Sequence, residues 1–403
     1  MTSSNYTSSS QDSLDKRFQA LEEVLLELQP LWRAQPFKQA RPAWCEAHPE
    51  LTAALLSLSD TELAHLRSDD SYLYQWLSDF IPEFSDLAAL LQIEKISSVD
   101  EQGGQHLDWA VPGRKWQQIT AFSSALQEVS GTAIEWCGGK GHLGRLLASK
   151  TQQSVTTLER DANLCEAGQK LSQRAGVKQT FKQVDVFSPL TPNLRQHHVV
   201  ALHACGELHR HLVRKAVAEH SPAIDIAPCC YHLYGEQNYQ PFSETSSLLL
   251  TKDDLRIAVT ETVTSKLREV RRRDREMAWK LGFIALLEGL SEEKTYRAIA
   301  PIDKHWLNGS FEEFCRQLAL RDGLEQYLRG QIAWYDYEAH GWVRQSEVMR
   351  LSILRHAVRR VIELWLVLDM ALYLESNGYQ IRLGTFCATH LTPRNILLSA
   401  RQN

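Results

Sequence analysis

The chain has 403 residues, of which 43% are apolar and 23% are charged, and its formal net charge is −5 at pH 7. This composition is typical of a globular protein large enough for two domains, and the negative charge excludes nucleic-acid binding by overall charge, so any such contact must be local. No apolar run approaches the roughly 18 residues of a membrane span, and eight cysteines are too few for a disulfide framework, so we expect a cytoplasmic protein with reduced thiols and no membrane contact.

The N-terminal part of the chain is expected to be a short tail followed by helices. The stretch from Thr2 to Gln11 is rich in Ser, Thr and Asn without an apolar core, so we expect residues 1–13 to be a disordered tail rather than a signal peptide. Residues 14–108 show helical periodicity, and Ser59-Asp-Thr-Glu62 has the spacing of a capping box. The region is dense in aromatic residues, namely Tyr72, Tyr74, Trp76, Phe80 and Phe84. Either these helices pack over the rim of a sheet, or they recognise a substrate by stacking on bases.

The segment Ala133-Ile-Glu-Trp-Cys-Gly-Gly-Lys-Gly-His-Leu-Gly144 has the pattern of a cofactor-binding turn. A short apolar strand ends at Glu135, a glycine-rich turn follows, and a helix is expected over 143–150. Glycine lets the backbone bend sharply and lets a nucleotide-like ligand approach, while the start of the helix offers free N–H groups.

Two cofactors suit this turn. Read as Gly139-x-Gly141-x-x-Gly144, it satisfies the dinucleotide fingerprint, in which a pyrophosphate lies at the helix N-terminus. The carboxylate of Glu135 instead favours S-adenosylmethionine (SAM), because it would repel phosphates and attract the ammonium and sulfonium groups of that cofactor. We therefore predict SAM, with an NAD(P)-dependent oxidoreductase as the alternative.

Acidic residues also end the next two predicted strands. The strand 155–158 leads to Glu159, about 20 residues past the glycines, where a carboxylate can accept hydrogen bonds from ribose hydroxyls. The strand 180–186 carries Asp185, which could accept from the amine of an adenine, while Val186 or Phe187 packs on its ring.

The remaining elements predict an α/β fold. Strands are expected at 198–206 and 223–232, and their alternation with helices is typical of a doubly wound, mostly parallel sheet. A long helical pattern over 346–375 ends at Asn377-Gly378. The last two strands, 379–386 and 395–399, are so close in sequence that they can pair directly only as an antiparallel hairpin. We therefore predict seven strands closed by this hairpin, with an N-terminal helical region and a helical insertion.

At these motifs the chain resembles the SAM-dependent methyltransferases. The segment Glu135-Trp-Cys-Gly-Gly-Lys-Gly-His142 looks like their first motif, and Leu202-His-Ala-Cys-Gly206 with Pro228-Cys-Cys-Tyr-His232 resembles one methyltransferase-like subgroup. That subgroup is similar to the tRNA 2′-O-methyltransferases, although this chain has Ala204 where those place Leu and Tyr231 where they place His. The resemblance implies a methyltransferase domain over 109–232 and 345–403.

The resemblance also implies which residues form the site. SAM contacts are expected from Glu135, Cys137, Gly138, Gly139, Gly141, His142, Glu159, Asp185, Val186 and the backbone near His203. The methyl acceptor is expected between Cys205 and the segment Cys229–His232. We expect the enzyme to hold acceptor and sulfonium in line, with His203 or His232 as the base where the acceptor must lose a proton. The catalytic candidates are His203, Cys205, Cys229, Tyr231 and His232.

The adjacent cysteines Cys229 and Cys230 leave three interpretations open. They could hold zinc together with imidazoles, one of them could add to C6 of a pyrimidine as a nucleophile, or both could line the pocket as small apolar groups. Adjacent cysteines rarely bind one metal ion, and no acidic pocket for pyrimidine chemistry is visible in the sequence. We therefore assign them to the lining and predict no metal.

An insertion over 233–344 separates the fifth strand from the long helical pattern. Within it, Lys266 to Lys280 holds seven Lys or Arg residues against three acids, centred on Arg271, Arg272 and Arg273. This run is either a solvated helix face or a surface that binds RNA phosphates. We therefore predict a SAM-dependent methyltransferase whose acceptor the sequence does not identify, with RNA favoured over a protein side chain or a small molecule. A SAM-binding module without catalytic activity is a further alternative, and no feature of the sequence indicates the oligomeric state.

Overall fold

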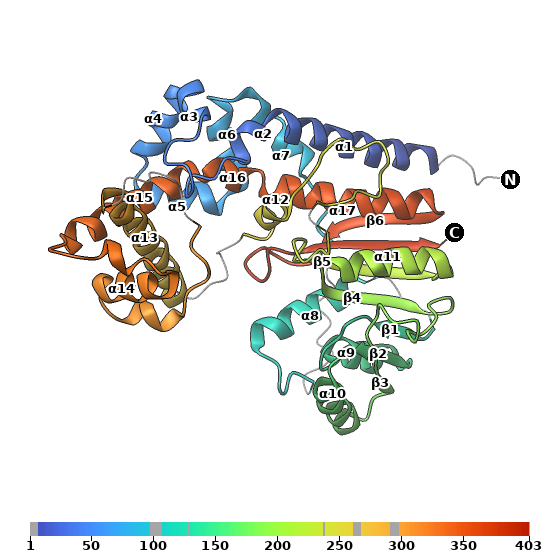
Figure 1. The fold of residues 1–403 in the computed structure, drawn as a ribbon. Coiled ribbons are helices and arrows are strands. Elements are labelled where there is room, and N and C mark those ends of the chain that lie inside the picture. Colours follow the sequence, from blue (N-terminus) through green and yellow to red (C-terminus); the bar gives the residue numbers. More distant parts are fainter. Residues whose placement is uncertain are drawn as a thin grey trace. The chain divides into compact units, whose positions relative to one another are not determined.

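The computed structural model describes residues 7–96, 107–126, 129, 131–236, 238–260, 267–290 and 298–402. The chain forms two compact units, each drawn in Figure 1. The sheet unit consists of Met1–Leu26, Asp86–Glu261 and Arg359–Asn403, and the helical unit consists of Glu27–Ser85 and Thr262–Val358. The domain boundaries that we drew from the sequence remain a prediction.

A mostly parallel sheet forms the centre of the sheet unit. Within the described residues it has seven strands in the order β3-β2-β1-β4-β5-β7-β6, and β7 runs antiparallel to both of its neighbours. The strands are β1 (Ala133–Glu135), β2 (Val155–Glu159), β3 (Gln179–Gln183), β4 (His198–Cys205), β5 (Ala223–Cys229), β6 (Tyr379–Thr385) and β7 (Ile396–Gln402). The predicted α/β fold with its antiparallel C-terminal hairpin is therefore confirmed.

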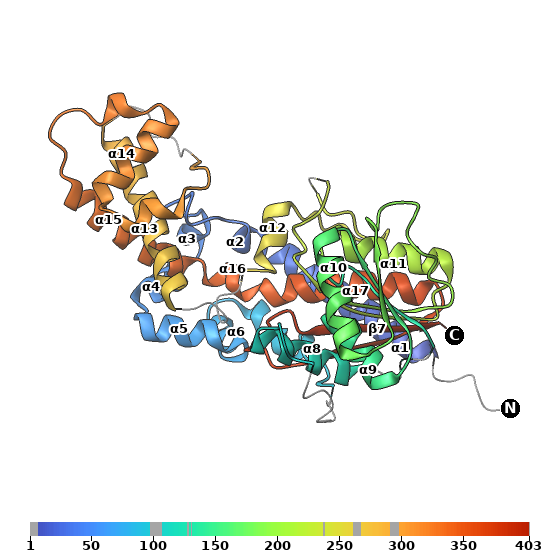
Figure 2. The ribbon, with the colours of Figure 1, turned by 90° about the horizontal axis from the view of Figure 1, so that it is seen from below.

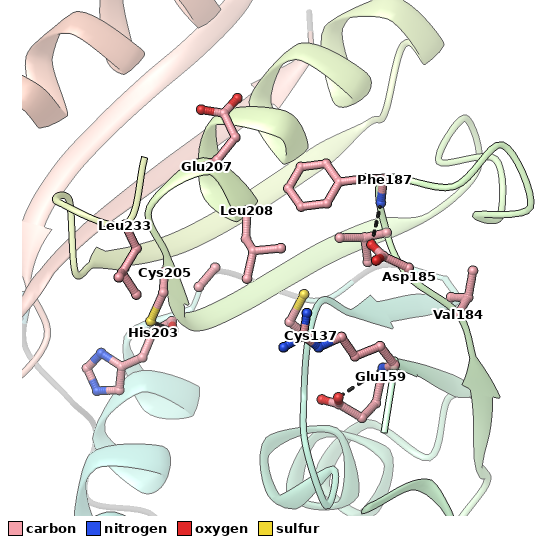
Figure 3. A pocket seen from close by; sticks show the side chains of 13 residues that line it. Cys137, Glu159, Val184, Asp185, Phe187, His203, Cys205, Glu207, Leu208 and Leu233 are labelled. Carbon is pink, nitrogen blue, oxygen red and sulfur yellow. Dashed lines mark hydrogen bonds between the residues drawn. The ribbon is translucent and has the colours of Figure 1, made fainter. Parts of the chain in front are cut away.

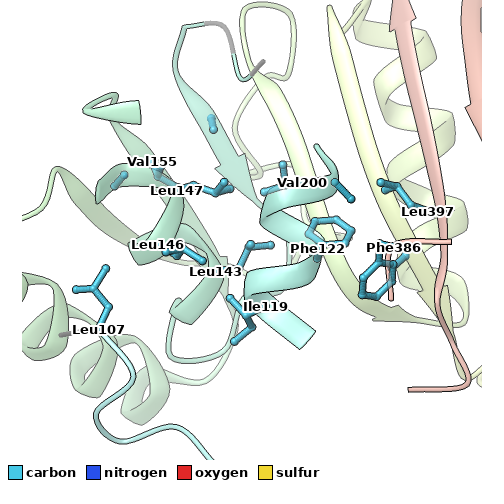
Figure 4. Packing of buried hydrophobic residues seen from close by; sticks show 14 of the residues in the cluster. Leu107, Ile119, Phe122, Leu143, Leu146, Leu147, Val155, Val200, Phe386 and Leu397 are labelled. Atoms are coloured by element: carbon cyan, nitrogen blue, oxygen red, sulfur yellow. The ribbon is translucent and has the colours of Figure 1, made fainter. Parts of the chain in front are cut away.

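The sheet unit also contains helices. They are α1 (Thr7–Glu27), α7 (Leu87–Leu90), α8 (Gly113–Ala125), α9 (His142–Thr151), α10 (Ala162–Ala175), α11 (Glu207–Glu219), α12 (Lys252–Ile257) and α17 (Arg359–Ser376). Of these, α9, α10, α11 and α17 contact strands of the sheet. Figure 4 shows one core cluster, in which Phe122 of α8 and Leu146 of α9 pack with strand residues such as Val200. In this cluster Phe122 meets Phe386 edge to face, with 5.4 Å between the ring centroids.

A buried charge network ties three neighbouring strands together. Asp225 of β5 accepts a hydrogen bond from His198 of β4 at 2.5 Å and another from Arg401 of β7 at 2.9 Å. His198 and Asp225 have no exposed side-chain surface. Removal of one partner from such a pair leaves a buried charge without compensation, which is costly.

The helical unit has its own core. Its elements are α2 (Gln29–Trp32), α3 (Trp44–Ala47), α4 (Pro49–Ser57), α5 (Asp60–Ser68), α6 (Asp70–Ser78), α13 (Leu267–Leu290), α14 (Phe311–Asp322), α15 (Trp334–Leu351), α16 (Ile353–Ala357) and the 3₁₀ turns η1 (Pro82–Phe84), η2 (Lys304–Asn308) and η3 (Glu325–Tyr327). Trp279 and Phe283 of α13 pack with Phe314 of α14. Figure 2 shows α13, α14 and α15 together. The capping box from Ser59 to Glu62 is confirmed.

Two predictions about helices differ from the structure. The pattern over 346–375 is not one helix, because the chain leaves α-helical geometry at Ser352 and Val358, where ψ is 0°, and forms the end of α15, then α16 and α17. Apolar periodicity continues across both breaks, so the pattern hides them. Helix α1 begins at Thr7, inside the range expected to be a disordered tail; residues 1–6 lie outside the described part of the chain. No helix among the described residues is long and apolar enough to cross a membrane.

Candidate functional site

The turn after β1 is built on positive backbone angles. Cys137, Gly139 and Gly141 have φ of 53°, 61° and 63°. The turn is tied back to the sheet, because the Gly138 N–H donates to the carbonyl of Leu158 at 3.1 Å. A Cβ placed on Gly139 would meet nothing within 4 Å, so this part of the turn faces open space.

Glu135 lies behind this turn, on its sheet side. Its side chain is buried and accepts a hydrogen bond from the Thr157 hydroxyl at 2.7 Å. A Cβ on Gly138 would lie 2.4 Å from the Glu135 carboxyl carbon, and one on Gly144 would lie 2.5 Å from its Oε2. These two glycines are therefore needed for close packing on Glu135. Burial raises the pKa of this carboxyl to about 7.

Glu159 and Asp185 lie at one end of a cavity of about 420 Å³ (Figure 3). Glu159 Oε2 accepts from the Gly139 N–H at 3.0 Å, and its Oε1 accepts from the N–H groups of Arg160 and Asp161 at 2.9 and 3.0 Å. Asp185 Oδ1 accepts from the Phe187 N–H at 3.0 Å. Both carboxylates are thus fixed by backbone donors beside the cavity.

The other end of the cavity comes from β4 and the segments that follow β4 and β5. Strand β4 has a β-bulge, seen as a register shift between Leu202 and Cys205, and His203 in this bulge has φ of 63°. The Glu207 N–H donates to the carbonyl of Leu233 at 3.0 Å, which brings Leu233 into the cavity wall. Figure 3 shows His203, Cys205 and Leu233 on the side away from Glu159.

The segment after β5 holds the remaining catalytic candidates. Cys229 and Tyr231 are buried, and Cys229 Sγ lies 3.3 Å from Cys205 Sγ. The Tyr231 hydroxyl and His232 Nδ1 are buried atoms with no hydrogen-bond partner in the described residues. Burial lowers the pKa of His203 to about 4, so this imidazole is neutral at physiological pH.

The structure brings only part of the predicted set to the cavity. Of the cofactor candidates, those that line it are Cys137, Glu159, Asp185, Val186 and His203. Gly138, Gly139, Gly141 and His142 belong to the turn that carries Cys137 and to the start of α9. The side chain of His142 is buried, and its Nδ1 pairs with Arg145 at 3.0 Å.

Sequence analysis missed several lining residues, namely Arg160, Val184, Ala204, Glu207, Leu208 and Leu233. Arg160 directly follows Glu159 and Ala204 lies in a quoted motif, so proximity to the motifs could have indicated both. Leu233 directly follows the quoted motif that ends at His232, and its backbone bonds with Glu207 and Cys230 bring it to the cavity.

The predicted basic residues lie in the helical unit. Arg271, Arg272 and Arg273 are on α13, where Arg271 and Arg273 are exposed and Arg272 is half-buried. Lys266, the first residue of the basic run, lies outside the described residues.

Comparison with known proteins identifies the chemistry of the sheet unit. Residues 114–237 match the model of a family described as a methyltransferase domain. The chain is also similar to the crystal structure of coclaurine N-methyltransferase bound to N-methylheliamine and SAH, with 12% identity over 78% of this chain and 94% of that chain and a TM-score of 0.26, a likeness too low to bear on the substrate. The sheet unit therefore carries a SAM-dependent methyltransferase domain with a Rossmann-like fold.

Proposed function

We propose that the cavity at the carboxyl ends of β1, β2 and β4 is the SAM site, and that the methyl acceptor enters beside Cys205 and Leu233. The observation that carries this proposal is the convergence of two fixed carboxylates and an exposed aromatic ring on one cavity. Ligands of doubly wound sheets bind at this edge of the sheet.

Glu159 and Asp185 suit the adenosine part of SAM. Each oxygen of an ionised carboxylate can accept two hydrogen bonds, so after its three backbone bonds Glu159 has capacity left on Oε2 for one ribose hydroxyl. Asp185 can accept from an exocyclic amine. The ring of Phe187 is 50% exposed and is free to cover an adenine face.

The glycine turn suits the methionine part. Gly139 leaves room for close approach, and Glu135 behind the turn supplies a carboxyl whose ionised form a nearby cation would favour. Burial is the main cause of the shifted pKa values of Glu135 and His203, and Lys115 of α8 adds a smaller lowering effect to both. Lys115 is exposed, and we assign its ammonium to the methionine carboxylate of SAM.

His203 is the base that we assign for an acceptor that must lose a proton. It lines the cavity and is unprotonated at neutral pH, because burial lowers its pKa to about 4. A base of this strength accepts a proton only from a group that becomes acidic as it is methylated. His232 and Tyr231 then shape the acceptor side.

RNA is the acceptor class that we favour. Arg271 and Arg273 are exposed on α13 and lie in a run with excess positive charge, which suits phosphate contacts on a protein whose net charge is −5. Replacement of Arg271, Arg272 and Arg273 by Ala should weaken RNA binding and flatten its salt dependence. Binding that is unchanged by the triple replacement would contradict this role.

Calorimetry with SAM and with NAD tests the cofactor site. We expect SAM to bind and NAD not to bind. For the acceptor, transfer of tritiated methyl groups into fractionated lysate should yield a product sensitive to nuclease. A product sensitive to protease, or one that passes a small-molecule filter, would contradict RNA while leaving the cofactor site intact.

A further inference from the structure

Three thiols converge where β4 and β5 end. The Sγ atoms of Cys205 and Cys229 are 3.3 Å apart, and with that of Cys230 all three lie within 4.8 Å of one another. Cys229 is buried and the other two are half-buried. All three belong to the sheet unit.

Backbone geometry explains how adjacent cysteines can face one point. Side chains normally alternate between the two faces of a strand, which is why neighbouring cysteines rarely bind one ion. Cys230 leaves this pattern, because its φ is 47°, in the left-handed region that non-glycine residues seldom adopt. The bulge in β4 brings Cys205 into register with Cys229. Two local departures from strand geometry thus aim three thiols at one place.

The spacing of the thiols fits a tetrahedral metal ion. With Zn–S bonds of about 2.3 Å, two thiolates on one zinc are about 3.8 Å apart. The observed separations, from 3.3 Å to at most 4.8 Å, bracket this value. Thiol donors favour zinc over magnesium or calcium, which prefer oxygen ligands.

His232 lies two residues after Cys230 in the chain. The Nδ1 atom of His232 is buried and has no hydrogen-bond partner in the described part of the chain. Buried polar atoms are nearly always paired, so this unpaired imidazole nitrogen points to a missing partner, although no nitrogen of His232 lies within 4.8 Å of all three thiols. A set of three thiolates and one imidazole is a closed set, which is typical of structural zinc sites.

We propose that Cys205, Cys229 and Cys230 bind Zn²⁺, and that the side chain of His232 turns toward the ion to become its fourth ligand. Binding replaces three S–H bonds by Zn–S bonds and releases three protons to solvent, without any redox step. The ion would fix the ends of β4 and β5 to each other. It would thereby hold Cys205 and the chain leading to Leu233 in the cavity wall.

The test measures metal rather than methyl transfer, so its result does not depend on the proposed acceptor. The full chain is expressed in zinc-supplemented medium, purified without chelator and analysed by mass spectrometry of the metal. We expect stoichiometric zinc in the wild type and in Cys387→Ser, a control outside the cluster, and loss of zinc in Cys230→Ser. Zinc retained in Cys230→Ser, or absent from the wild type, would overturn the site.

Measurements on the wild type alone cover the case in which the variant does not fold. Chelation should lower Tm, and added zinc but not magnesium should restore it. Replacement by Co²⁺ should produce the absorption of thiolate-to-cobalt charge transfer. A Cys205–Cys229 disulfide in the peptide map, or a Tm unchanged by chelation of the loaded protein, would contradict the proposal. In His232→Gln we expect faster loss of zinc to a chelator, and an unchanged rate would remove His232 from the ligand set.

Discussion

The carboxylate of Glu159 offers the sharpest test of the cofactor site. In the structure it accepts three backbone N–H bonds, one from Gly139 and two from Arg160 and Asp161. Glu159→Gln keeps the size of the side chain but replaces one carboxylate oxygen by an NH₂ group. This group donates, so it cannot accept a hydrogen bond from a backbone N–H or from a ribose hydroxyl. Hydrogen bonds to charged groups contribute about 1.5–3 kcal/mol each. Since 1.4 kcal/mol corresponds to about tenfold in Kd, we expect SAM affinity to fall by about 10- to 100-fold.

Isothermal calorimetry with SAM or its product measures this loss. Glu166→Gln is the matched control, because Glu166 is an exposed acid on the adjoining helix α10 and pairs with Lys170 across one turn. We expect the control to bind as the wild type does and both variants to melt within a few degrees of it. If Glu159→Gln binds SAM with unchanged Kd, the cofactor does not lie along this carboxylate and our assignment of the adenosine end fails.

Three further predictions concern stability. Gly144→Ala should destabilise the fold by about 1–3 kcal/mol in urea unfolding, because the new Cβ would overlap Glu135, whereas Gly113→Ala has open space and should be near neutral. Asp225→Ala should cost about 3–5 kcal/mol, since it leaves buried His198 and Arg401 without their partner, and a cost below about 1 kcal/mol would show that the network is dispensable. Burial lowers the pKa of His203 and of His209 to about 4, so below pH 6.5 the unfolded state binds more protons than the folded state. The free energy of unfolding should therefore fall as the pH drops from 6.5 towards 4. Urea titrations at pH 7 and pH 5 measure this fall, and His209→Gln should make it smaller.

The strands, the mostly parallel sheet and its antiparallel C-terminal hairpin could be predicted from the sequence, because periodicity and strand-end acids are local signals, whereas the spatial order of the strands was not predicted. Glu159 and Asp185 could be predicted for this reason, although β3 ends at Gln183, two residues before the acid. The position of the Glu135 side chain could not be predicted from the sequence. Its carboxylate faces Gly138 and Gly144 rather than the cavity, and that contact depends on how the turn folds back on the strand.

The convergence of the three thiols and the breaks in the C-terminal helices depend on backbone angles that could not be predicted from the sequence. Cys230 and His203 adopt positive φ although neither is glycine. The alternation of side chains along a regular strand therefore predicts the wrong side-chain directions around both residues. The same limitation applies to the breaks at Ser352 and Val358, since both interrupt an unbroken apolar pattern.

The strand order also has a consequence for biosynthesis. Strand β7 is the last to leave the ribosome, yet it occupies an interior position between β5 and β6. Until it arrives, β5 presents unpaired backbone groups along one side, a surface that invites pairing with other chains. This side of β5 therefore stays unpaired while Thr262–Val358, the second segment of the helical unit, is synthesised, and chaperone dependence would be greatest during that interval.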